Sequence, residues 1–151
     1  MPVNRANFNS KEEVMKKLLN FLAIFSAALA CCFVAACGDR QPVTADEYTV
    51  IITASDTAFD FDGKTLKDYM DYLQDNQKLT YSINNGMVTA INGKSNTTSS
   101  FWMLYTSDEQ NSNDAWGTFE YEGEIYGSAT LGAESLPVKE GCVYVWAYQS
   151  F

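Results

Sequence analysis

Alternating apolar and polar positions predict strands in three stretches of the chain. "EYTVIITAS" (residues 47–55) alternates and is rich in β-branched residues, which is typical of a strand. "FWMLYTS" (101–107) is a strongly apolar strand, and "CVYVWAYQSF" (142–151) is predicted to be the closing strand.

Between the first two strands the apolar spacing changes to that of a helix. The positions i, i+3, i+4 and i+7 are Leu66, Tyr69, Met70 and Leu73. Thr65 and Asp68 have the spacing of a capping box, with Asp in place of the usual Glu or Gln. We therefore expect a helix that begins after Thr65 and ends near Asn76.

Asn-Gly pairs mark two turns after this helix. Asn85-Gly86 lies between two short apolar stretches and predicts a hairpin, and Asn92-Gly93 predicts a second turn. Residues 109–117 are expected to be a loop. Residues 118–131 are expected to be a strand or hairpin with a turn near position 123.

One helix after the first strand, followed by several strands, predicts an α+β fold in which the helix packs on one face of a sheet. The last strand divides into two faces. Its aliphatic face carries Val143, Val145 and Ala147, and its aromatic face carries Cys142, Tyr144, Trp146 and Tyr148. We expect the aliphatic face to lie under the helix. The aromatic face would then be open to a ligand or covered by residues 109–127.

The amino-terminal part of the chain has the layout of an export signal. Lys16 and Lys17 precede an apolar run at residues 18–36, which ends in "VAAC". This tetrapeptide resembles a bacterial lipobox, in which the cysteine, here Cys37, is lipidated and becomes the new amino terminus. An uncleaved apolar anchor is the alternative. The predicted segments are an upstream extension (1–14), a signal peptide (15–36), a lipidated cysteine with a tether (37–47) and one domain (48–151).

The predicted cleavage and the composition together restrict the chemistry that the chain can perform. Cys31 and Cys32 fall within the removed peptide, and Cys142 is the single cysteine of the domain. We therefore expect no disulfide within the domain. The full chain has a net charge of −9 and no histidine. Such an acidic surface disfavours nucleic acid. The lack of imidazole removes the commonest general base and zinc ligand. We predict no enzymatic activity, no catalytic residue, no metal site and no required cofactor.

Acidic residues in two places do not change this prediction. The stretch "DFDG" (residues 60–63) lacks the ligand spacing of an EF-hand loop and is expected to be a turn. Glu120, Glu122 and Glu124 alternate along a strand and are expected to be a solvated face.

Aromatic residues are the positive signal in the second half of the domain. They are Phe101, Trp102, Tyr105, Trp116, Tyr126, Trp146 and Tyr148. Large aromatics supply apolar area and, in Tyr and Trp, a polar handle, so they suit a binding surface. They are equally able to form a second small core.

Three stretches together resemble the C-terminal domain of transcobalamin and intrinsic factor, which also occurs in bacterial surface lipoproteins. They are "VTAINGK" (88–94), "FWMLY" (101–105) and "LPVKEGCVYVWAY" (136–148), and the resemblance spans residues 49–148. It implies a β-grasp-like mixed sheet and binding of cobalamin or a related corrinoid. In that family the residues matching Phe101, Trp102, Met103 and Leu104 face the corrin ring.

These observations lead to one functional hypothesis and one alternative. The hypothesis is a lipid-anchored module on the outer face of a bacterial membrane that captures a corrinoid for uptake, with a transporter or second binding chain as partner. The alternative is a surface module that binds protein or glycan. The chain has no helical barrel domain to close over a corrinoid, and residues 109–127 are longer than in the vitamin carriers. The candidate ligand-binding residues are Phe101, Trp102, Met103, Leu104, Tyr105, Trp116 and Trp146.

Overall fold

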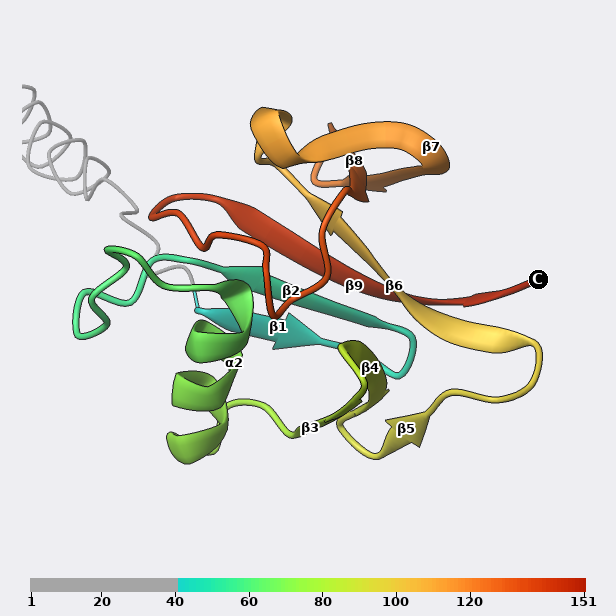
Figure 1. The fold of residues 1–151 in the computed structure, drawn as a ribbon, viewed down its shortest axis with the longest axis horizontal. Coiled ribbons are helices and arrows are strands. Elements are labelled where there is room, and N and C mark those ends of the chain that lie inside the picture. Colours follow the sequence, from blue (N-terminus) through green and yellow to red (C-terminus); the bar gives the residue numbers. More distant parts are fainter. Residues whose placement is uncertain (1–40) are drawn as a thin grey trace, which may run out of the picture. The chain divides into compact units, whose positions relative to one another are not determined.

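The computed structural model describes residues 41–151, which form two antiparallel sheets and a helix (Figure 1). The larger sheet has the strand order β1-β2-β9-β6-β8-β7. Its strands are β1 (Val43–Ala45), β2 (Thr49–Thr53), β6 (Ser100–Thr106), β7 (Ser112–Tyr121), β8 (Glu124–Ala129) and β9 (Val143–Ser150). The smaller sheet consists of β3 (Tyr81–Asn84), β4 (Met87–Ile91) and β5 (Lys94–Ser95). The helix is α2 (Leu66–Asp75), and a 3₁₀ turn, η1 (Glu109–Asn111), precedes β7.

The α+β prediction is confirmed, but the predicted mixed sheet is wrong. Every strand pair in the described part of the chain is antiparallel. The predicted tether, residues 37–47, includes β1, which pairs along β2 at the edge of the larger sheet. The sheet therefore begins before Tyr48. The predicted extension, signal peptide and Cys37 lie outside the described residues.

Local sequence signals predicted the helix closely. Thr65 is the N-cap, its side chain accepts from the Asp68 N–H, and the Asp68 carboxylate accepts from the Thr65 N–H at 2.8 Å. Asn76 is the C-cap. The apolar face of α2 is fully buried. The helix thus forms where a cap and an amphipathic pattern coincide.

The hairpin turns also lie where expected. Asn85 and Gly86 both have positive φ, as the type I′ turn between β3 and β4 requires. The turn between β7 and β8 includes Gly123, as predicted. The loop predicted at residues 109–117 is wrong, because β7 begins at Ser112 and runs through most of it.

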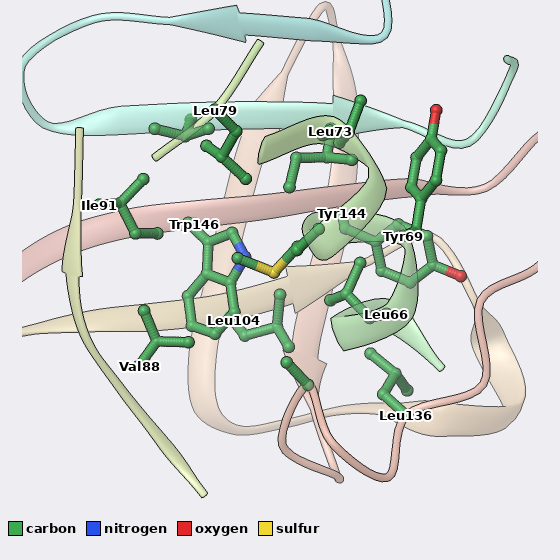
Figure 2. Packing of buried hydrophobic residues seen from close by; sticks show 14 of the residues in the cluster. Leu66, Tyr69, Leu73, Leu79, Val88, Ile91, Leu104, Leu136, Tyr144 and Trp146 are labelled. Atoms are coloured by element: carbon green, nitrogen blue, oxygen red, sulfur yellow. The ribbon is translucent and has the colours of Figure 1, made fainter. Parts of the chain in front are cut away.

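The prediction for the two faces of β9 is wrong, because the aromatic face and not the aliphatic face lies under the helix. Tyr144 and Trp146 lie in the core beneath α2 with Leu66 and Leu73 (Figure 2). The aliphatic side chains of β9 lie in a second core with Tyr105 and Tyr126, under the β7–β8 hairpin. In Figure 1 this hairpin and α2 lie on opposite sides of the central strands.

The reversal has a physical explanation in side-chain volume. A helix stands well away from a sheet, and the large rings of Tyr144 and Trp146 fill that gap. The hairpin brings its own aromatic residues, Tyr126 and Phe119, so smaller side chains suffice on the strand that faces it.

Candidate functional site

The candidate site lies where the two sheets meet beside β6. On one side β6 pairs with β9 along its whole length, but on the other side β8 pairs only with Tyr105 and Thr106. The smaller sheet is fastened to the remaining part of that edge. Asn96 forms the link, because its Oδ1 accepts from the Trp102 N–H at 3.0 Å and its Nδ2 donates to the Val88 carbonyl at 2.9 Å.

A groove of about 530 Å³ opens along this seam between the sheets. Its lining comes from the start of β4, the middle of β6, one residue each of β7 and β9, the end of β8 with the segment after it, and the last residue of the chain. The main lining residues are Met87, Val88, Trp102, Met103, Leu104, Trp116, Leu131, Trp146 and Phe151. The volume lies within the usual range for small-molecule sites.

The groove is apolar and uncharged. No Asp, Glu, Lys or Arg lines it, although the whole chain carries a net charge of −9. The hydroxyls in its lining belong to Ser128 and Thr130. Both already donate to carbonyl oxygens, of Asn113 at 2.9 Å and of Asn111 at 3.2 Å. A ligand would therefore meet mostly apolar surface and few directional contacts.

The rim of the groove carries large apolar side chains in water. The exposed fractions are 57% for Met87, 69% for Trp116, 39% for Leu131 and 71% for Phe151. Contiguous exposed apolar surface is unusual on a monomeric protein and commonly marks a binding surface. The rim is thus the part of the site that a ligand can cover.

The structure brings together most of the residues proposed from sequence. Trp102, Leu104 and Trp146 form a buried floor, and Trp116 stands at the rim. Met103 is half-buried and borders the groove, but it packs against the core under the hairpin. In Figure 2 the six-membered ring of Trp146 lies toward Val88 and Leu104, and its nitrogen lies on the side away from Val88. That buried indole N–H has no hydrogen-bond partner among residues 41–151.

Phe101 and Tyr105 lie outside the groove lining. Successive side chains of a strand point to opposite faces, and Tyr105 packs in the core under the hairpin, where its hydroxyl donates to Gln149 at 3.0 Å. Phe101 contacts Phe151 at 6.4 Å between ring centroids.

Sequence reasoning missed Met87, Leu131 and Phe151. Met87 directly follows the Asn-Gly turn, where an apolar residue is ordinary strand composition. Its place in the groove depends on how the two sheets meet, which no local pattern signals.

Lys94 is a positively charged residue close to Trp102 in the sequence, but its ammonium group interacts with residues outside the groove lining. The Lys94 ammonium lies 3.1 Å from the Glu47 carboxylate, 4.3 Å from the Tyr48 ring centroid and 5.1 Å from that of Tyr148. The hydrogen bond to Glu47 raises the pKa of Lys94. The Lys94 carbonyl accepts from the Trp102 indole N–H at 2.8 Å. The Lys94 backbone therefore holds the Trp102 ring in the floor, whereas the Lys94 ammonium group stays with Glu47, Tyr48 and Tyr148.

Asp108 orders the start of the strand that carries Trp116. Its carboxylate accepts from the Lys139 ammonium at 2.8 Å and from the Asn111 side chain at 2.7 Å, and it is only 4% exposed. Burial works to raise the pKa of Asp108, but the hydrogen bonds from Lys139 and Asn111 outweigh it and hold the pKa below its ordinary value. Hydrogen bonds to charged groups contribute about 1.5–3 kcal/mol, and partial exposure of Lys139 favours the lower end.

We expect Asp108→Ala to lower the free energy of unfolding by about 2 kcal/mol at neutral pH. A lowered carboxyl pKa stabilises the fold above the unfolded-state value of about 3.9 and loses that effect as the pH falls toward the folded-state pKa. The difference between the variant and the native chain should therefore shrink at pH 3. Urea unfolding at both pH values measures it, with exposed Asp62→Ala as control. A deficit that is unchanged at pH 3 would contradict the assignment.

Neither a membrane span nor a metal site is evident within residues 41–151. No helix there has the length and apolar character needed to cross a bilayer, and no cluster of His, Cys, Asp and Glu there could hold a metal ion.

Comparison with protein-family models, with curated proteins and with solved structures finds no match for this chain, so its geometry is the basis for interpreting the groove.

Proposed function

We propose that the chain is a lipid-anchored, extracytoplasmic module that binds a small ligand with an apolar face in the groove between its two sheets. One observation carries this proposal. An uncharged groove gathers Trp102, Met103, Leu104, Trp116 and Trp146, which the sequence had singled out in two predicted strands and a predicted loop. The lipobox-like "VAAC" supports the anchor and hence the location outside the membrane.

A corrinoid is the first ligand to test. The proposal includes a β-grasp relationship to the C-terminal domain of the vitamin carriers, supported by the resemblance of residues 49–148 and by the packing of α2 on one face of the larger sheet. The groove is open and would cover one face of a large ring. Contacts to one face sacrifice part of the binding energy, so we expect micromolar affinity unless a transporter or second binding chain covers the other face.

The second candidate is a protein-interaction module at the same surface. It is favoured by the exposed apolar rim, because Met87, Trp116 and Phe151 resemble the aromatic and methionine anchors of protein interfaces. A pull-down from the native cell surface distinguishes it, since a protein partner would be captured without any small molecule.

We expect Met87→Ser to weaken binding of cobalamin or cobinamide by roughly tenfold. A ligand seated in the groove covers the Met87 side chain, and burial of a methionine side chain contributes about 1.5–3 kcal/mol. Calorimetric titration of the purified protein measures the affinity. The two corrinoids differ in the lower nucleotide loop, so a preference for one reports which face of the ring is bound.

Ile125→Ser is the matched control for this experiment. Ile125 is also an exposed apolar residue, at 71%, but it does not line the groove. Its substitution should leave corrinoid affinity unchanged. Equal loss in both variants would contradict binding in the groove. The absence of heat from either corrinoid would remove the corrinoid proposal and favour the interaction module.

A further inference from the structure

The exposure of Trp116 arises from a specific interruption of strand β7. The register of β7 with β8 runs from Asn113 opposite Ser128 directly to Thr118 opposite Gly127. Residues 114–117 therefore have no opposite residues in the register with β8 and form a bulge. Bulges redirect side chains and are common next to functional sites.

Hydrogen bonds on both strands hold this bulge in place. The Ser128 hydroxyl donates to the Asn113 carbonyl at 2.9 Å and accepts from the Trp116 N–H at 3.3 Å. The Asn113 side-chain oxygen accepts from the Ala115 N–H at 2.9 Å. The bulge is therefore a defined structure that fixes the backbone of Trp116.

Two glycines permit the same geometry. A Cβ at position 127 would lie 2.9 Å from the Asn113 carbonyl oxygen, so only glycine lets the strands approach here. Gly117 has φ of +88°, which other residues rarely adopt. The hydrogen bonds and the two glycines thus both favour a backbone in which residues 114–117 leave the hydrogen-bonded pairing of β7 with β8.

The bulge leaves an indole ring at 69% exposure beside an apolar groove. Burial of such a ring would stabilise the fold through the hydrophobic effect, but the fold leaves the ring in water. The other exposed apolar residue of this hairpin, Ile125, lies away from the groove. The bulge thus places the Trp116 side chain where a molecule in the groove would meet it.

The chemistry of the groove restricts the ligand class. Its lining has no cation to attract a phosphate or carboxylate, and the net charge of −9 on the chain disfavours anionic ligands further. Its hydroxyls already donate to backbone carbonyls. Recognition must therefore rely on shape and on the faces of aromatic rings, which accept flat molecules without directional hydrogen bonds.

We propose that the bulge at residues 114–117 is a rigid support that presents Trp116 as a stacking surface for ligands that have a flat ring face and carry no negative charge. This inference rests on the proposed function, because it concerns the same groove. It assigns ligand selection to a residue in the segment where the chain departs from the vitamin carriers. Trp116 is accordingly the specificity-determining residue of the site.

Three dyes with related fused-ring systems test the inference: Nile red, which is neutral, cresyl violet, which is cationic, and resorufin, which is anionic. We expect Nile red and cresyl violet to bind the native protein and resorufin to bind at least tenfold more weakly. Trp116→Ala should weaken Nile red binding by roughly five- to 150-fold, the range for stacking on one aromatic side chain. Trp116→Phe should retain most of the affinity, and Ile125→Ala should retain all of it.

Dye fluorescence and calorimetry measure binding, and urea unfolding checks that the exposed Trp116 substitutions leave stability unchanged. If the native protein binds neither Nile red nor a corrinoid, the proposed function itself fails. If it binds Nile red but Trp116→Ala binds equally well, or if resorufin binds as tightly as Nile red, the groove remains a site and the role of Trp116 is refuted.

Discussion

Replacement of Trp102 by alanine is expected to destabilise the fold by about 3–5 kcal/mol, whatever the ligand. The side chain is only 5% exposed and belongs to the core beneath α2. Its ring contacts Tyr148 edge-on at 5.3 Å, and its indole N–H donates to the Lys94 carbonyl at 2.8 Å. The substitution therefore removes core volume and a hydrogen bond between the two sheets.

Urea unfolding measures this loss, and Phe101→Ala is the matched control. Phe101 is the preceding residue on β6, is only partly buried and contacts a ring, Phe151, that is itself exposed. We expect it to cost much less stability than Trp102. A Trp102→Ala protein of native stability that no longer binds ligand would show that the ring serves the groove and not the core.

This result bears on how the groove should be probed. A substitution on its floor at Trp102, Leu104 or Trp146 changes stability and binding together, so it cannot separate the two. The rim residues Met87 and Trp116 can be changed without loss of core packing. Ligand experiments therefore belong on the rim.

The parts of the fold that follow local rules were predictable from the sequence. The cap at Thr65 and the Asn-Gly turns depend on a few adjacent residues and on backbone conformations that only some residues adopt. Their positions agree with the structure. The α+β class also followed, because it needs only the order of elements.

The parts that depend on which surfaces meet were not predictable. Alternation along β9 separates Val145 from Trp146 but does not say which face lies under the helix, and the prediction chose the wrong one. The polar composition of residues 109–117 is typical of a loop. It instead encodes a strand with a bulge, whose pairing depends on Gly127 and Ser128 across the hairpin.

The candidate site shows the same division. Aromatic composition identified Trp102, Trp116 and Trp146 without placing them. Met87 and Phe151 joined the site only through the seam between two sheets, and Tyr105 left it because strand alternation turns it to the opposite face. Composition thus indicated the chemistry of the groove, and the topology determined its members.

Cys37→Ser is expected to abolish fatty-acid incorporation completely in a bacterial host. The thiol is the nucleophile that receives the lipid in the proposed maturation, and a serine hydroxyl does not replace it. The native chain should yield a mature protein that begins at acylated Cys37 and lacks residues 1–36. Because lipidation precedes removal of the leader in this scheme, the variant should accumulate with the leader still attached. Labelling with a radioactive fatty acid and intact-mass spectrometry measure both effects.

Cys142→Ser is the control, because it changes the remaining cysteine of the predicted mature chain and should be labelled and processed like the native protein. An uncleaved anchor predicts instead that the native chain and Cys37→Ser have the same mass, apart from the substitution, and that neither carries lipid. The distinction matters for the groove. Two or three acyl chains, at about 0.8 kcal/mol per buried methylene, hold a protein firmly at the surface of a bilayer. An anchored domain with an open, uncharged groove is suited to hand a ligand to a neighbouring membrane protein that covers its other face.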